Sequence, residues 1–344
     1  MSAIREATRT AAVLAYTEDL QERLCAALEA IDGAAPFDRR ELQLPHGGAA
    51  RPCVLSDGPV VERAAVHVTR TRAPRLPSAA TTHRPELAGR GYQAASISVI
   101  VHPRNPYAPT GHLNLRYFEA DGEGESNLAW FGGGFDLTPV FGFVEDAVAW
   151  HRAAREACQP FGHDLYARFK RQCDEYFVLR HRGEARGIGG IFFDDLRSLD
   201  AGGEDLDRCF DFARGVGETF TSAYLEILER RCDIPWGDRQ RQFQLYRRGR
   251  YVEFNLLHDR GTRFGLEAGS WAESLLASLP PLAAWRYDWE PEPGSEEEAL
   301  AGFLLPRDWA NLPADAEIAA TLATSPAHSA AVAAAPPRQR GDSR

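Results

Sequence analysis

The segment "ASISVIVHPRNPYAPTGHLNLRYF", residues 95–118, decides the fold because it contains two strand-like runs joined by a loop. Ser98 and His102 alternate with apolar residues in the first run, and His112, Asn114 and Arg116 do so in the second. Successive side chains of a strand point to opposite faces, so each run has one apolar and one hydrogen-bonding face. The link "PRNPYAPT" holds three prolines, which predicts a loop. We therefore predict a hairpin with one polar face.

This polar face is typical of a pocket for a polyanionic organic substrate. Ser, His and Asn exchange hydrogen bonds, and Arg116 is suited to binding carboxylates. The alternative is a sheet with one solvated face, although such a face usually carries Lys, Glu and Thr.

Helical and strand-like patterns alternate irregularly along the rest of the chain, which predicts an α+β fold more than a doubly wound sheet. Helical spacing occurs at 1–32 and at about 143–158, 161–181, 205–231 and 271–279, and strand-like runs occur near 94–102, 112–119, 188–193, 251–258 and 284–289. We expect one catalytic domain over 1–312. The Ala/Pro-rich segment 313–344 is predicted to be a disordered tail, because it has too few large apolar residues to offset its ordering entropy.

The composition is that of an ordinary globular protein and excludes several partners. The net charge of −10 argues against binding to nucleic acid or to an anionic membrane surface. No apolar run is long enough to predict a membrane span. None of the six cysteines forms a C-x-x-C or C-x3-C-x2-C motif, which argues against an iron–sulfur cluster or zinc ribbon. Reduced cysteines in a cytoplasmic enzyme are the expectation.

Two further segments carry candidate site residues. In "WFGGGFDLTP", residues 130–139, three glycines precede Asp136 and predict either positive φ or a close approach to another group; a tight turn is the alternative. "HRGEARGIGGIFFDDL", residues 181–196, combines Arg186 with a glycine-rich turn, an apolar strand and the acidic pair Asp194–Asp195.

The segment from 247 onward is the densest in candidate residues. Glu253, Asn255 and Asp259 would share one face of the strand predicted at 251–258. Ser270 and Glu273 match a capping box, so a helix should begin at Trp271 and its free N–H groups could bind a carboxylate.

Four histidines, His102, His112, His151 and His181, could converge on a divalent metal, although no short ligand spacing supports such a site. His151 and His181 follow apolar residues at helical spacing. The simpler interpretation of each is therefore a buried, hydrogen-bonded histidine.

These motifs together resemble the family of oxygen-dependent coproporphyrinogen III oxidases. The resemblance extends over roughly residues 10–312. It rests on the segments "THRPELAGRGYQAASISVIVHP", "HPRNPYAPTGHLNLRYF", "WFGGGFDLTP", "HRGEARGIGGIFFDDL", "RRGRYVEFNLLHDRGTRFGL", "SLPPLAAWRYDWEPEPGS" and "PRDW", which occur in that order.

The resemblance implies a large antiparallel β-sheet flanked by helices on both faces, in a homodimer. It also implies a reaction of haem biosynthesis, in which two propionates of coproporphyrinogen III are oxidatively decarboxylated to vinyl groups of protoporphyrinogen IX. O2 is the oxidant and no organic cofactor is required. The absence of a C-x3-C-x2-C motif agrees with this class and not with the unrelated radical enzyme.

Carried over residue by residue, the resemblance implies three sets of functional positions. The catalytic positions are His112 as proton donor, Arg116, Asp136, Arg186 and Asp259. The substrate-binding positions are Ser98, Asn114, Leu115, Arg116, Gly269, Ser270 and Trp271. The positions proposed as metal ligands are His102, His112, His151 and His181.

Trp271 departs from the family pattern, which usually has an arginine at this position. One guanidinium contact to the substrate is therefore absent, and the indole could stack on a pyrrole ring instead. Two other functions remain open from the sequence alone, namely a histidine-metal oxygenase acting on another substrate and a non-catalytic porphyrinogen-binding protein.

Overall fold

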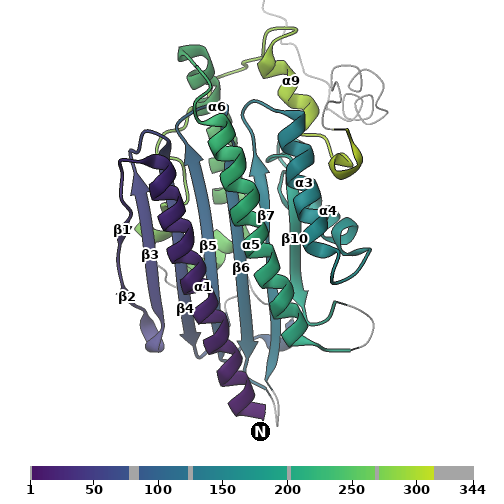
Figure 1. The fold of residues 1–344 in the computed structure, drawn as a ribbon. Helices are drawn as coiled ribbons and strands as arrows, with labels where there is room; N and C mark the ends of the chain where they lie inside the picture. Colours follow the sequence, from purple (N-terminus) through teal and green to yellow (C-terminus); the bar gives the residue numbers. More distant parts are fainter. Residues whose placement is uncertain (1, 77–84, 123–126, 200–202, 268–270, 314–344) are drawn as a thin grey trace, which may run out of the picture.

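A single antiparallel sheet forms the centre of the computed structural model, which describes residues 2–76, 85–122, 127–199, 203–267 and 271–313 (Figure 1). The strand order is β1-β3-β4-β5-β6-β7-β10, and β2 pairs with β3. The strands are β1 (Asp38–Arg39), β2 (Leu42–Gln43), β3 (Ala49–Ser56), β4 (Val61–Ala73), β5 (Tyr92–Pro103), β6 (Thr110–Ala120), β7 (Leu128–Thr138) and β10 (Gly189–Leu196). A separate pair is formed by β8 (Val178–Leu179) and β9 (Glu184–Ala185).

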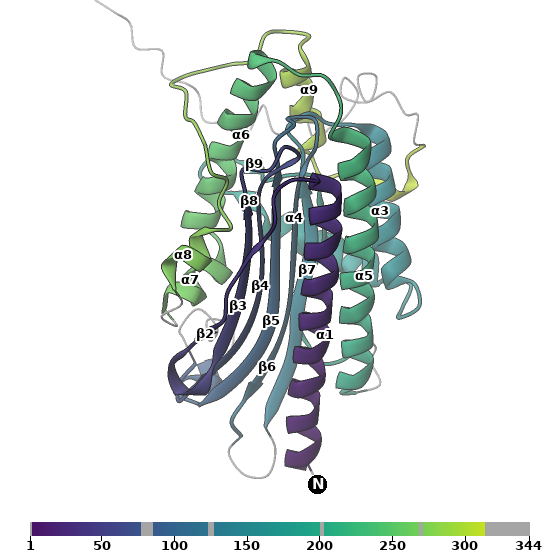
Figure 2. The same cartoon turned by 60° about the vertical axis from the view of Figure 1, so that its left-hand side comes forward.

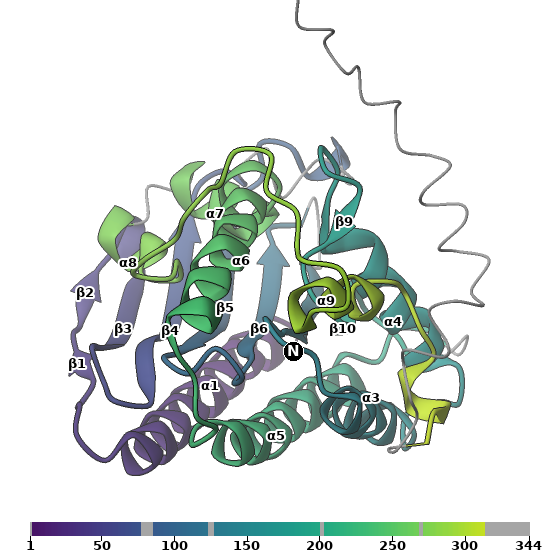
Figure 3. The ribbon, with the colours of Figure 1, turned by 90° about the horizontal axis from the view of Figure 1, so that it is seen from above.

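Helices cover both faces of this sheet, which confirms the predicted fold class (Figures 2 and 3). One face packs against α1 (Ser2–Asp32), α5 (Leu206–Arg231) and α3 (Val144–Cys158), while α4 (Leu165–Tyr176) runs along β10. The other face is covered by α6 (Asp238–Leu257), α7 (Arg260–Glu267) and α8 (Ala272–Leu276). The remaining helical segments are η1 (Pro45–Gly47), η2 (Pro85–Leu87), α9 (Glu296–Phe303) and η3 (Trp309–Asn311).

The predicted hairpin forms the centre of the sheet as β5 and β6. Ser98 lies opposite Asn114, and Ile100 lies opposite His112. The apolar residues that alternate with these positions pack against the α1–α5 layer and form the main core. Burial of this face is worth about 25 cal/mol per Å² of apolar surface, so the alternation determines which face of each strand points to the helices.

Two of the predicted strands are wrong. Residues 251–258 belong to helix α6 almost to their end, and residues 284–289 form no strand. The buried residues Phe243, Arg247, Tyr251 and Phe254 recur at helical spacing, and this longer pattern outweighs the short alternation in "YVEFNLL". The predicted tail lies outside the described residues, apart from Pro313 at its start. Among the helices that the structure describes, none is both long and apolar enough to cross a membrane.

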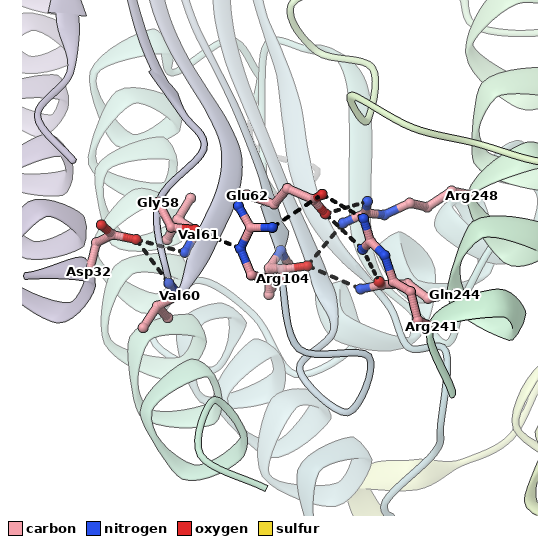
Figure 4. Close-up of polar contacts among 10 residues, drawn as sticks. Asp32, Gly58, Val60, Val61, Glu62, Arg104, Arg241, Gln244 and Arg248 are labelled. Carbon is pink, nitrogen blue, oxygen red and sulfur yellow. Dashed lines mark hydrogen bonds and ion pairs between the residues drawn. The ribbon is translucent and has the colours of Figure 1, made fainter. Parts of the chain in front are cut away.

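Two buried carboxylates attach the helical layers to the same end of β4 (Figure 4). Asp32, at the end of α1, accepts hydrogen bonds from the backbone N–H groups of Val60 and Val61 at 3.1 and 2.8 Å. Glu62, 3% exposed, binds Arg241 and Arg248 of α6, with its closest contacts at 2.5 and 2.6 Å. Glu62 therefore holds α6 over the second face of the sheet.

The ion pairs of Glu62 predict an acid-sensitive contribution to stability. Burial opposes its ionisation, but Arg241 and Arg248 outweigh burial and lower the pKa of the carboxyl from 4.5 to about 2. Because the folded-state pKa is the lower one, the contribution is complete above about pH 4.5 and is lost as the pH falls toward 2. We expect Glu62→Gln to lose about 3 kcal/mol of unfolding free energy at pH 7, and much less at pH 3.

Urea unfolding of both proteins at pH 7, 4.5 and 3 measures this difference. The matched control is Glu41→Gln, whose side chain is 80% exposed and should change stability by less than about 0.5 kcal/mol. An equal difference between Glu62→Gln and the wild type at all three pH values would contradict the assignment.

Candidate active site

A cleft of about 290 Å³ lies between the sheet and the layer formed by α6, α7 and α8. Its floor consists of alternate residues of β4, β5 and β6. The predicted site residues that line it are Ser98, His112, Asn114, Arg116, Arg186, Asp259 and Trp271. The hairpin and Asp259 thus share one cleft, as predicted, although more than 140 residues separate Arg116 from Asp259.

The side chain of Leu115 does not belong to this set. It is buried in the core on the opposite face of β6, where Leu113 and Tyr117 also lie. Any contact of Leu115 with a substrate is therefore left to its backbone, because the two-residue period of the strand turns its side chain toward the helices. The flanking Asn114 and Arg116 do face the cleft.

A buried ion pair lies beneath the cleft floor at its β6–β7 side. Asp136 is 1% exposed, and its carboxylate accepts two hydrogen bonds of 2.7 Å from Arg186 Nη2. It also lies 2.6 Å from Nδ1 of His112. A carboxylate only accepts hydrogen bonds, so Nδ1 of His112 carries a proton and donates it to Asp136, which leaves Nε2 for a substrate.

The surroundings of this ion pair keep both groups charged. Burial alone would raise the pKa of Asp136, but Arg186 and His112 outweigh burial and the pKa lies below its ordinary value. Arg186 is enclosed by the rings of Phe177, Tyr251 and Phe254, at 4.2, 4.8 and 4.7 Å from its guanidinium carbon. Its Nη1 donates to Asn255 Oδ1 of α6 at 3.1 Å, which connects the ion pair to the covering helix. Asp136 thus acts on the cleft through His112 and Arg186.

The second cluster in the cleft contains two arginines and one carboxylate. Asp194 Oδ1 accepts from Arg116 Nη2 at 2.9 Å, and its Oδ2 lies 3.1 Å from Arg260 Nη2. Arg116 also donates to Asn114 Oδ1 at 2.8 Å. Burial alone would raise the pKa of Asp194, but the two arginines outweigh burial and the pKa lies below its ordinary value. The acidic pair 194–195 is visible in the sequence, but no pattern in the sequence indicates that Asp194 binds Arg116.

Asp259 is held rigidly at the start of α7. Its Oδ1 accepts from the Tyr176 hydroxyl at 2.9 Å, and its Oδ2 accepts from the N–H and the hydroxyl of Thr262 at 2.8 and 2.9 Å.

The predicted strand face of Glu253, Asn255 and Asp259 is wrong, because Glu253 and Asn255 lie on helix α6. Glu253 binds His181 and Arg182, whereas Asn255 faces Arg186. Residues two apart on a helix point in different directions.

The glycine run of residues 132–134 lies within strand β7, so the tight-turn alternative is wrong. The predicted close approach is confirmed at Gly134, which has φ of 138°, and where a Cβ would lie 2.1 Å from the Ile191 carbonyl oxygen. At Gly132 a Cβ would lie 2.7 Å from Arg116 Nε and 2.8 Å from Asp194 Oδ1. The absence of a side chain at Gly132 therefore leaves space for Arg116 and Asp194.

The four histidines do not converge, and the prediction of a common metal site is wrong. His102 binds Thr110 and the Ser278 carbonyl, and His151 binds Tyr166 and the Ile188 carbonyl, so both ring nitrogens of each are occupied. His151 is buried as the simpler interpretation predicted, but His181 lies in an exposed turn beside Glu253 and His258. Within the described ranges, no three His, Cys, Asp or Glu side chains are arranged to hold a metal ion.

The segment around Trp271 is only partly described. Gly269 and Ser270, the predicted helix cap, lie outside the described residues. Helix α8 begins at Ala272, one residue later than predicted. Trp271 lines the cleft, is 39% exposed and lies 5.8 Å from the guanidinium carbon of Arg40.

Several residues that line the cleft were not predicted from the sequence. Arg260, Tyr176 and Phe264 come from α7 and the end of α4, and His67 and Thr69 come from β4. The alternation of "VHVTRT" on β4 could have predicted that His67 and Thr69 share one face of this strand. His67 Nδ1 contacts Ser274 at 3.3 Å, and burial lowers the pKa of His67 to about 4, so this end of the cleft is polar and uncharged at neutral pH.

The chain was compared with models of known protein families. The model described as coproporphyrinogen III oxidase matches residues 12–309, which include every described element of the cleft.

Proposed function

Because the chain belongs to the coproporphyrinogen III oxidase family and thus to haem biosynthesis, we propose that it converts coproporphyrinogen III to protoporphyrinogen IX with O2 as oxidant. The observation that carries this proposal is the joint presence of Arg116, Arg260 and Asp259 in one cleft. Guanidinium groups bind carboxylates through paired hydrogen bonds. A carboxylate accepts the N–H groups that a porphyrinogen presents at its centre.

The reaction balances for each propionate as follows. The substituent –CH2–CH2–COO⁻, one O2 and one proton give –CH=CH2, CO2 and H2O2. One C–H bond on the carbon next to the ring and the C–COO⁻ bond break, and O2 takes up the two electrons. Two such cycles convert two of the four propionates to vinyl groups.

The residues of the cleft contribute orientation and charge to this chemistry. Asp259 accepts a pyrrole N–H and draws off its proton, which makes the ring electron-rich enough to react with O2. The resulting peroxide removes the hydrogen from the propionate, and loss of CO2 follows. His112 takes up a second proton on Nε2 and donates it in the reaction, while its Nδ1–H stays bound to Asp136, which holds the ring in place. Ser98 and Asn114 extend the hydrogen-bonding floor.

No step of this mechanism passes through a metal. The ring nitrogens of His102 and His151 bind other protein groups, and His181 lies in an exposed turn next to Glu253, so the histidine set does not fit one ion. The oxygen-dependent class is further supported by the absence of a C-x3-C-x2-C motif from the sequence.

The test is anaerobic addition of coproporphyrinogen III to the purified protein, followed by O2. We expect no product before O2 is admitted, and afterwards one CO2 per vinyl group formed and fluorescent protoporphyrin on re-oxidation. Binding of the porphyrinogen without O2 uptake would instead identify a non-catalytic binding protein. Activity that a chelator abolishes would favour the metal-dependent alternative.

The replacement Trp271→Arg is expected to lower KM for the four-carboxylate substrate by about threefold to tenfold. Trp271 lines the cleft, and an arginine there adds one charge-assisted hydrogen bond, worth about 1.5–3 kcal/mol before its ordering entropy is subtracted. Steady-state kinetics measures the change. Trp271→Lys is the control for charge alone, because it cannot form the bidentate contact. An unchanged or higher KM in the arginine variant would refute this role.

We also propose a homodimer in the cytoplasm. Most of the large exposed apolar side chains of the described residues come from α6–α8 and the following loop, and large apolar side chains are typical of protein interfaces. They are Leu256, Leu257, Leu266, Trp271, Leu276, Leu282, Trp285 and Tyr287. Light scattering during size-exclusion chromatography tests the dimer, and cell fractionation tests the location.

A further inference from the structure

Asp194 joins two arginines that come from different layers of the molecule. Arg116 is on strand β6 of the sheet, and Arg260 begins α7, one of the helices that cover the cleft. Arg116 donates to Oδ1 of this carboxylate at 2.9 Å, and Nη2 of Arg260 forms an ion pair with the other oxygen, Oδ2, at 3.1 Å. Asp194 is thus a bridge between the floor of the cleft and its cover.

The two arginines need such a bridge to stay close together. Two positive groups repel each other, and the repulsion grows as they leave water. Between them, Asp194 removes this repulsion and fixes two long side chains that otherwise have considerable rotamer freedom. Aromatic rings support the arrangement, since the guanidinium carbon of Arg260 lies 4.9 Å from the Tyr176 ring and that of Arg116 lies 5.7 Å from Phe192.

The local backbone is shaped to place Asp194 in this position. The pairing of β10 with β7 shifts register between Phe193 and Leu196, and Asp195 has φ of 53°. A bulge of this kind redirects a side chain, and aspartate tolerates the left-handed conformation better than most residues. Gly132 on the neighbouring strand leaves the space that the carboxylate and Arg116 occupy.

We propose that Asp194 is a positioning residue that holds Arg116 and Arg260 as a matched pair of ligands for carboxylate groups of the substrate. Five N–H donors are available on each guanidinium, so the contact with Asp194 leaves others for a ligand. The inference rests on the proposed function for the identity of the substrate, a tetrapyrrole polycarboxylate. The geometry also allows a different role, in which Asp194 occupies the arginines until a substrate carboxylate displaces it. The two roles predict opposite changes in affinity.

The test is Asp194→Asn in the full-length protein, compared with Asp146→Asn. Both variants remove one negative charge from a carboxylate that binds two arginines, but Asp146 binds Arg230 and Arg231 outside the cleft. We expect Asp194→Asn to raise KM for coproporphyrinogen III about tenfold and to lower kcat by less than threefold, because ligand placement is lost and the chemical groups remain. For Asp146→Asn we expect KM to change by less than twofold.

Binding of coproporphyrin III provides a readout that does not depend on turnover. This oxidised porphyrin keeps the four carboxylates and can be titrated by quenching of tryptophan fluorescence, with a Kd increase of about tenfold expected for Asp194→Asn. Thermal unfolding of each variant shows whether the fold is intact. Asp194→Glu is the second variant; it keeps the charge and should bind more tightly than Asp194→Asn.

Each result decides the question. An unchanged or lower Kd in Asp194→Asn overturns the positioning role and favours displacement by the substrate. A wild-type protein that binds coproporphyrin III but forms no vinyl product refutes the proposed function, while the Kd values still decide the role of Asp194. A wild-type protein that does not bind the porphyrin overturns both.

In the double variant Asp194→Asn/Arg260→Gln, we expect the two effects on Kd to be less than additive in free energy, because both remove the same contact.

Discussion

Asp136→Asn is expected to lower kcat by at least about 100-fold and to destabilise the protein by about 3–5 kcal/mol. The replacement removes the charge that compensates the buried guanidinium of Arg186, whose side chain is 2% exposed. It also removes the carboxylate, 2.6 Å from Nδ1, that orients the ring of His112. Loss of an orienting carboxylate beside a catalytic histidine generally costs far more in rate than in binding.

The chain offers a matched control for this variant in a second buried ion pair. Asp146 on α3 is 4% exposed and lies 2.7 Å from Arg231 on α5, on the helical side of the sheet away from the cleft. Asp146→Asn should lose about 1–3 kcal/mol of stability, less than Asp136→Asn because Arg231 keeps its contact with Glu145. Its kcat and KM should stay within twofold of the wild-type values.

Urea unfolding and steady-state kinetics on both variants separate stability from catalysis. Assays at about 15 °C in the presence of substrate keep a destabilised variant folded. Comparable activity of Asp136→Asn and Asp146→Asn, measured on folded protein, would show that Asp136 is only structural.

Asp259→Asn is expected to lower kcat by about 100- to 1,000-fold with little change in stability. An amide cannot draw off a pyrrole proton, and its NH2 group presents donors where the mechanism needs an acceptor. The amide oxygen can still accept from Thr262, whose N–H and hydroxyl now bind Oδ2 at 2.8 and 2.9 Å. Asparagine and aspartate are similar helix caps, so α7 should remain in place.

A second capping aspartate serves as the control. The side chain of Asp205 accepts from the backbone N–H of Arg208 at 3.0 Å and caps α5, outside the cleft. Asp205→Asn should leave kcat and the unfolding free energy nearly unchanged. Coproporphyrin III titration shows whether Asp259→Asn still binds the macrocycle; retained binding with lost turnover is the expected result. Turnover of Asp259→Asn near the wild-type rate would rule out Asp259 as the proton acceptor.

The hairpin at residues 95–118 was predictable because its information is local. A strand repeats every two residues, and burial of one face decides which residues face the cleft. The same rule explains why Leu115 faces the core although its neighbours Asn114 and Arg116 do not. Family membership was predictable for a related reason, since several long motifs in fixed order are specific without any knowledge of their contacts.

Helix α6 shows where local patterns fail. "YVEFNLL" alternates like a strand over a few residues, and only the longer spacing of Phe243, Arg247, Tyr251 and Phe254 identifies the helix. The ion pairs from Glu62 of β4 to Arg241 and Arg248 then hold this helix over the cleft. These contacts join residues 179 and 186 positions apart and leave no periodic signal.

By itself, the sequence determined the family, the α+β class and the polar faces of β5 and β6, because these depend on motif order and on the two-residue period of a strand. Only the tertiary structure decided which charges meet: Asp136 with Arg186, and Asp194 with Arg116 and Arg260. It also separated the four histidines, since carbonyl groups of distant segments occupy ring nitrogens of His102 and His151. The physical reason is that a buried charge or imidazole must be satisfied by whichever partner the packing brings near, and that partner depends on strand register and helix placement over the whole chain.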